Sequence, residues 1–191
     1  MHPPSPWNLR GRLYLSVFAL PAAALPPLPA GIRPLTVAGR VLLGAAWVRY
    51  EPGGTLHYRE LLTAVLLRDL RVSIVDIWVD SEASRDGGRE LWAIPKDLAT
   101  LAIDPPAASA AGIATAVLRP GRRWPGRWPT PMSLRQARGD TLVETPVRGR
   151  TAIRGARIAW TAERDGRLAY LTGRKPMLSL MLDGFRMRFG R

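Results

Sequence analysis

The sequence predicts a mainly β fold of the α+β class, built as a single domain over residues 1–191. Short apolar or alternating segments recur along the chain, and turn-forming clusters such as Pro52-Gly53-Gly54 separate them. Eighteen glycines and eighteen prolines disfavour long helices. A chain of 191 residues can bury a hydrophobic core of its own. We therefore expect a sandwich or barrel-like sheet with a few short helices.

The expected strands are rich in β-branched and aromatic residues. They cover residues 13–19, 36–43, 46–50, 58–67, 71–79, 114–118, 141–145, 153–161, 167–172 and 185–189. Short helices are expected at 34–38, 81–85 and 176–182. The helix at 81–85 has Ser81 as its N-cap and Glu82 in its first turn, and Asp86-Gly87-Gly88 follows as a turn. Residues 105–116 and 119–131 are expected to form loops, the second as a lid or an oligomer contact.

The formal charge of +13 raises nucleic acid as a partner, but the distribution of charge argues against it. Arginines are scattered over the whole chain, and the tightest cluster is Arg122, Arg123 and Arg127. A coding bias towards arginine explains this pattern without a binding surface. We therefore expect no nucleic-acid partner.

Several kinds of catalytic site are excluded by composition. The chain has no cysteine, so disulfides, thiolate metal sites and cysteine nucleophiles are absent. It has only two histidines, His2 and His57, and no G-x-S-x-G motif, so neither a histidine-rich metal site nor an ordinary serine-hydrolase elbow is available. No nucleotide or flavin motif is present. We expect neither a metal nor a cofactor.

The N-terminal region has the outline of a signal peptide, because Arg10 and Arg12 precede an uncharged segment at 13–32. Four prolines interrupt that segment, so it cannot form a regular membrane-spanning helix. Its first half fits a buried strand equally well. We expect a cytoplasmic protein with no membrane association.

Lysine is rare in this arginine-rich chain and occurs only at Lys96 and Lys175. Arginine stays protonated, whereas a buried lysine can lose its proton and attack a carbonyl carbon. Lys96 follows Ile94-Pro95, and Leu91 and Trp92 add apolar bulk around it. Such burial is expected to lower the pKa of the lysine.

Two motifs connect Lys96 with a known family. Tyr58 and Glu60 form a Tyr-x-Glu after a glycine-containing turn, and Gly88-Arg89-Glu90 is followed by Pro95-Lys96. The order and separation of these motifs, together with the opening segment 6–10, resemble the acetoacetate decarboxylase family. The resemblance spans residues 6–100, about half of the chain.

The resemblance implies a fold, a chemistry and a set of site residues. The fold would be a barrel or cone of antiparallel strands. Lys96 would form a Schiff base with a small oxo-acid, and Glu60 would move protons. Arg10 or Arg12 would bind the substrate carboxylate, and Tyr58 and Trp92 would also contact the substrate. Family members form homo-oligomers, which we expect here too.

The chain departs from the family pattern at two places. A second lysine usually follows the reactive one, but Asp97 occupies that position and would raise the pKa of Lys96 if it faced the amine. Because successive residues of an extended segment face opposite sides, we expect Asp97 to point away. Gly44-Ala45-Ala46 occupies a stretch where the family has a further acidic residue, which implies a less acidic and roomier pocket.

The first function expected is therefore decarboxylation of a small β-oxo acid through an iminium on Lys96. A Schiff-base aldolase, dehydratase or cyclase on the same scaffold is a close variant. Two alternatives come from other classes: a non-catalytic small-molecule-binding protein with an inherited fold, and a basic protein associated with nucleic acid.

Overall fold

The computed structural model describes all 191 residues and confirms the predicted mainly β fold. One α-helix, α1 (Glu82–Trp92), and two short 3-10 helices, η1 (Ala22–Ala24) and η2 (Ala169–Leu171), accompany the strands. The strands are β1 (Trp7–Pro21), β2 (Thr36–Val37), β3 (Arg40–Tyr50), β4 (Arg59–Leu66), β5 (Val72–Val79), β6 (Asp97–Leu98), β7 (Leu101–Asp104), β8 (Ala107–Ala110), β9 (Ala114–Arg123), β10 (Trp128–Pro129), β11 (Met132–Arg138), β12 (Thr141–Ala162) and β13 (Leu178–Phe189). None of the helices has the length and apolar character that crossing a membrane requires.

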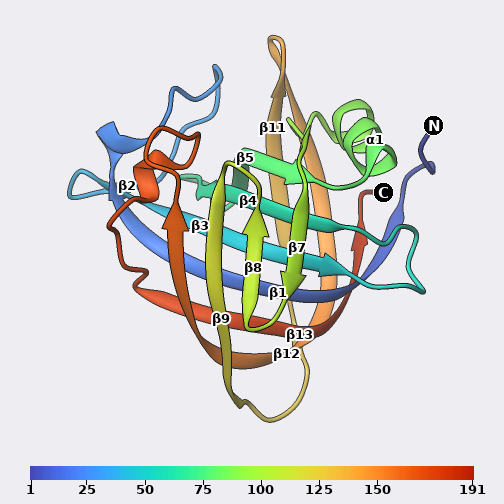
Figure 1. Cartoon of the computed structure of the whole chain (residues 1–191). Helices are drawn as coiled ribbons and strands as arrows, with labels where there is room; N and C mark the ends of the chain where they lie inside the picture. Colours follow the sequence, from blue (N-terminus) through green and yellow to red (C-terminus); the bar gives the residue numbers. More distant parts are fainter.

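All the strands belong to one sheet with the order β11-β5-β4-β3-β1-β13-β12-β9-β8-β7. The path closes on itself, because β11 pairs with β12 as well as with β5. Figure 1 shows β7, β8 and β9 crossing in front of β1, β3 and β4. The two chain termini lie on the same side of the molecule as α1, and Ser5 Oγ donates to the carbonyl oxygen of Arg191 at 2.9 Å.

Alternation along the long strands gives the sheet two apolar faces. In β1, Trp7 and Leu9 are buried on one side. On the other side, Arg10 and Arg12 are exposed near the start of the strand, and Tyr14 and Phe18 further along are buried. The larger hydrophobic cluster joins the first strands to β7, β8 and β9 and includes Trp47. The smaller cluster lies around Trp7, Trp92, Ile94, Leu134 and Phe185. The site described below borders this smaller cluster.

Several predicted elements have different limits in the structure. The strand expected at 36–43 is divided by a turn at Ala38-Gly39 into β2 and the start of β3. Strand β3 then continues into the strand expected at 46–50, because Gly44 and Ala45 pair with β4 and β1 without a break. Those expected at 141–145 and 153–161 both belong to β12. The strand expected at 167–172 is a turn that leads into η2.

The loops and short helices expected from proline content also need correction. Residues 34–38 contain β2 and residues 176–182 contain the start of β13, so neither segment is helical. Within the loop predicted at 105–116, β8 forms, and β9 then begins at Ala114, where the strand at 114–118 is predicted. The segment 119–131 contains the end of β9 and all of β10. Tertiary strand pairing overrides the local turn signals in each case.

Helix α1 begins where the sequence predicts and extends further. The Ser81 side chain accepts a hydrogen bond from the Ser84 backbone N–H at 3.3 Å, which confirms the predicted cap. The helix then continues through Gly87 and Gly88 to Trp92, so the turn expected there is wrong. The two glycines provide space: a Cβ on Gly87 would lie 2.5 Å from the Trp7 ring, and one on Gly88 would lie 2.7 Å from Lys96 Cδ.

We predict that Gly87→Ala destabilises the protein by about 1–3 kcal/mol, because overpacking against the rigid indole of Trp7 outweighs the better helix propensity of alanine. Urea unfolding measures the change. Gly155→Ala is the matched control, since its Cβ would meet nothing within 4 Å. Equal stability of the two variants would contradict the packing role assigned to Gly87.

Candidate active site

Lys96 lies in a short segment that joins α1 to β6. The helix ends at Ala93, which adopts the left-handed conformation with φ 56°, and Ile94-Pro95 then leads to the lysine. Arg89 fixes the backbone there: its Nε donates to the carbonyl oxygen of Lys96 at 2.6 Å, and its Nη2 donates to Asp97 Oδ1. The Asp97 carboxylate is half exposed and faces Arg89, in agreement with the expectation that it points away from the amine.

The Lys96 side chain is buried, and its amine has three hydrogen-bond partners. Nζ donates to Glu60 Oε2 at 2.9 Å, to Ser84 Oγ at 2.9 Å and to the Tyr58 hydroxyl at 3.3 Å. An ammonium group has three N–H donors, so all three are used. The side chain reaches this position over Gly88, where any larger residue would collide with its methylene groups.

Glu60 accepts on both carboxylate oxygens. Oε2 is bonded to Lys96, and Oε1 accepts from the Tyr50 hydroxyl at 3.1 Å. The Tyr50 and Tyr58 rings stack with centroids 4.3 Å apart, and Lys96 Nζ lies 5.1 Å from the centroid of the Tyr58 ring. Glu60 and Lys96 are 2% and 4% exposed, so bulk water does not screen their attraction.

The direction of the Lys96 pKa shift corrects the expectation from sequence. Burial lowers the pKa of the amine, but the charge of Glu60, with the hydrogen bonds to Glu60 and Tyr58, outweighs burial and raises the pKa above its ordinary 10.5. The resting lysine is therefore an ammonium. It becomes a nucleophile only when a proton leaves it, and Glu60 is the carboxylate within hydrogen-bond reach.

Both tyrosines stay protonated at neutral pH. Burial is the main cause of the raised pKa of Tyr50 and of Tyr58, and the negative charge of Glu60 raises both further. They act as neutral hydrogen-bond groups beside the pair formed by Lys96 and Glu60.

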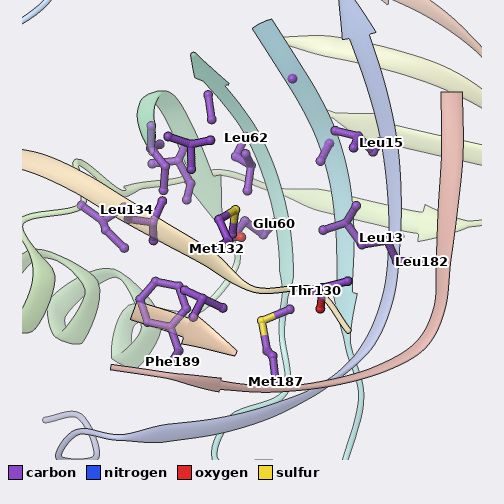
Figure 2. A pocket seen from close by; sticks show the side chains of 18 of the residues that line it. Leu13, Leu15, Glu60, Leu62, Thr130, Met132, Leu134, Leu182, Met187 and Phe189 are labelled. Atoms are coloured by element: carbon purple, nitrogen blue, oxygen red, sulfur yellow. The ribbon is translucent and has the colours of Figure 1, made fainter. Parts of the chain in front are cut away.

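This pair lies in the wall of a cavity of about 600 Å³. Of its 29 lining residues, 23 are hydrophobic. Figure 2 shows Glu60 among Leu13, Leu62, Met132 and Met187, whose side chains come from opposite sides of the cavity. Gly44 and Ala46, from the stretch Gly44-Ala45-Ala46, also line it.

Tyr58 and Trp92, which the resemblance implied as substrate contacts, both line the cavity. Tyr58 lines the cavity and contacts the amine. Trp92 also lines the cavity, where its ring packs edge-on against Trp7 and Phe189 at centroid distances of 4.7 Å and 4.5 Å.

The roles expected for Arg10 and Arg12 need correction. Both side chains lie on the exposed face of β1, opposite the face that lines the cavity. Arg12 contacts Glu51 at 3.5 Å and Asp183 at 3.4 Å. Arg10 pairs across the strands with Arg186, which in turn pairs with Arg150. Alternation along an extended strand makes it impossible for these arginines to share a face with Trp7 and Leu9.

Two contacting residues were missed by the sequence reasoning. Ser84 lies one helical turn before Gly87 and Gly88, and this run of small residues on one face of α1 was the signal available. Tyr50 ends β3 next to the Pro52-Gly53-Gly54 turn, and its hydrogen bond to Glu60 depends on the pairing of β3 with β4.

No group of three or more histidine, cysteine, aspartate or glutamate residues is arranged to hold a metal ion.

The sequence matches no protein-family model and no curated protein. Solved structures do match it. The enduracididine biosynthesis enzyme MppR, with HEPES buffer bound, has a TM-score of 0.68 at 16% identity, over 99% of this chain and 87% of that one. Acetoacetate decarboxylase from Legionella pneumophila has a TM-score of 0.66 at 14% identity, over 99% of this chain and 86% of that one.

This chain has the acetoacetate decarboxylase-like fold. An acetoacetate decarboxylase-like enzyme from Sphingomonas wittichii RW1 agrees, with a TM-score of 0.60 at 16% identity, over 97% of this chain and 91% of that one. The likeness extends over nearly the whole chain, whereas the sequence motifs covered only residues 6–100.

We predict that Glu60→Gln lowers the pKa of Lys96 to below its ordinary value. The substitution removes the negative charge that raises the pKa, while the burial that lowers it remains. Modification of Lys96 by 2,4-pentanedione should then reach its maximal rate at a lower pH than in the wild type. The pH profile of the modification, followed by peptide mass spectrometry, measures this shift.

Asp97→Asn is the control for that measurement, because it removes a neighbouring carboxylate that faces Arg89 instead of the amine. Its profile should match that of the wild type. A larger shift in Asp97→Asn than in Glu60→Gln would contradict the assignment of Glu60 as the partner that controls Lys96.

Proposed function

We propose that the protein is a Schiff-base-forming lyase in which the Lys96 amine attacks the carbonyl carbon of a substrate. The observation that carries this proposal is the buried contact of 2.9 Å between Lys96 Nζ and Glu60 Oε2 in the wall of a largely apolar cavity. A lysine with no adjacent carboxylate would need burial alone to deprotonate it. Here the carboxylate can take the proton directly.

The first steps need only these two side chains. Glu60 accepts a proton from the ammonium, and the neutral amine adds to the carbonyl carbon. The resulting carbinolamine loses its oxygen as water, with Glu60 returning the proton to the departing hydroxyl. The product is a positively charged iminium on Lys96. Tyr50 and Tyr58, which stay protonated, hold the carboxylate and the nitrogen in place throughout.

Decarboxylation of a β-oxo acid is the leading reaction. The bond to the carboxylate carbon breaks, its electron pair moves into the iminium to give an enamine, and carbon dioxide leaves. Protonation of the enamine carbon and hydrolysis of the iminium then release a ketone and free Lys96. An apolar cavity favours this step, because it solvates a carboxylate poorly and neutral carbon dioxide well.

A second candidate is Schiff-base aldol or dehydratase chemistry through the same enamine. No arginine lines the cavity, so no side chain other than Lys96 offers a positive charge to a substrate carboxylate. The enduracididine biosynthesis enzyme MppR, which shares the fold, is described in complex with the condensation product of pyruvate and imidazole 4-carboxaldehyde. That description supports carbon–carbon bond formation as a second use of such a site.

The proposal includes a homo-oligomer, as the resemblance to the family implies, and the cytoplasmic location expected from the N-terminal segment. Trp124 and Trp128 near the end of β9 and in β10 are 46% and 47% exposed, which makes this segment the most suitable contact for another copy.

We predict that incubation with acetoacetate or pyruvate and sodium borohydride gives a stable adduct on Lys96. Reduction converts the iminium into a secondary amine, which intact-protein and peptide mass spectrometry detect. The adduct should be absent in Lys96→Ala and unchanged in Lys175→Ala, the control at the other lysine of the chain. Absence of an adduct with every carbonyl compound tried would favour a non-catalytic binding protein with an inherited fold.

A further inference from the structure

The cavity extends far beyond the reacting groups. Alternate residues of β4 line it from Glu60 through Leu62 and Ala64 to Leu66. At the rise of an extended strand, this row is about 20 Å long. Cross-strand neighbours on β3 and β1 widen the row into a floor, since Gly44 pairs with both Ala64 and Val17. A small oxo-acid bound at Lys96 would occupy only one end of it.

The charged groups of this cavity lie together in one part of it. Apart from glycine and proline, the only lining residues that are not hydrophobic are Glu60, Lys96 and Thr130. Tyr50 and Tyr58 add two hydroxyl groups, and both of them are bonded to Glu60 or Lys96. The floor beyond Glu60 offers nothing that would bind a second charged or strongly polar group of a ligand.

The middle of the floor is kept open by small residues. Gly44, Ala46 and Ala64 lie there, between larger leucines at either end. Apolar side chains of later strands form the facing wall, and Figure 2 shows Met132, Leu134, Met187 and Phe189 among them. Methionine side chains adapt to ligands of different shape. The space is therefore a trough that ends at a reactive amine.

We propose that the substrate is a carbonyl compound with a long apolar chain or ring system, whose body lies along the β4 floor while its carbonyl carbon meets Lys96. The inference rests on the proposed Schiff-base function. It includes β-oxo acids with long alkyl chains, whose decarboxylation gives methyl ketones. It excludes small oxo-acids as the preferred substrate, because they leave most of the apolar surface in contact with water.

The volume and shape of the trough favour a small molecule over a second copy of the chain. About 600 Å³ is within the range of pockets that enclose drug-sized ligands. Its ionisable groups are buried and bonded to one another, so they offer no charge pattern for a protein partner. A partner chain would also have to fill a concave space that ends on Lys96.

A homologous series of methyl ketones from acetone to 2-undecanone tests the inference. Each is incubated with the protein and borohydride, and the concentration that gives half-maximal trapping on Lys96 is measured by mass spectrometry. Burial of each additional methylene should lower this concentration by roughly a factor of three to four until the trough is filled. Equal half-maximal concentrations across the series would overturn the inference and leave the Schiff-base function standing.

The variant Ala64→Phe tests whether the alkyl chain of the ketone binds along the β4 floor. A phenyl ring in the middle of the floor should raise the half-maximal concentration of 2-undecanone at least tenfold more than that of acetone. Ala159→Phe, at an exposed position of β12, is the matched control and should leave the series unchanged. Equal effects of Ala64→Phe on both ketones would place the alkyl chain elsewhere and contradict the inference.

A separate binding measurement tests the trough for the case in which no Schiff base forms on Lys96. If no ketone is trapped, the proposed function fails. Binding of 2-undecanol and of 2-butanol is then compared by the change in intrinsic tryptophan fluorescence, since Trp7 and Trp92 are two of the seven tryptophans and line the cavity. Tighter binding of 2-undecanol, weakened in Ala64→Phe, would support the trough as a site for an apolar body. Equal binding of the two alcohols would overturn the inference. It would also be overturned if the protein showed no preference for long ligands and formed a dimer that Met132→Arg dissociates, because the trough would then be a contact between two copies of the chain.

Discussion

The buried ion pair between Lys96 and Glu60 is the interaction on which the arrangement of the site depends. Removing two charges from water is costly unless each is fully hydrogen-bonded. Tyr50, Tyr58 and Ser84 supply those bonds, and they come from β3, the segment preceding β4, and α1. The helix must therefore pack closely against the sheet, which explains why glycines occupy positions that would otherwise favour alanine. The same pair keeps the nucleophile protonated until a proton is transferred.

The sequence was sufficient to predict the parts of the site that depend on short motifs. Lys96, Glu60 and Tyr58 come together as the resemblance to the family implied, and Asp97 faces away as expected from an extended backbone. The pKa direction could not be predicted, because it depends on the distance between Lys96 and Glu60, which are brought together only by tertiary packing. Ser84 was missed for the same reason.

The errors in the fold have a common physical origin. The sequence predicts breaks at 44–45 and 86–88, but strand pairing at the first and close packing against Trp7 and Lys96 at the second decide the conformation. The resemblance to the family implied a substrate-binding arginine near the N-terminus, for which Arg10 and Arg12 were the candidates. Their orientation depends on which face of β1 is buried, and alternation along this strand puts Arg10 and Arg12 on the outer face.

That outer face has a consequence for the protein in solution. Arg10, Arg186 and Arg150 lie side by side on three neighbouring strands, and none of them forms a salt bridge. Like charges directly opposite one another destabilise a sheet. Dissolved anions such as sulfate will accumulate there and screen this repulsion. Rising ionic strength should therefore strengthen the pairing of β1, β13 and β12, although it weakens the salt bridges elsewhere on the surface.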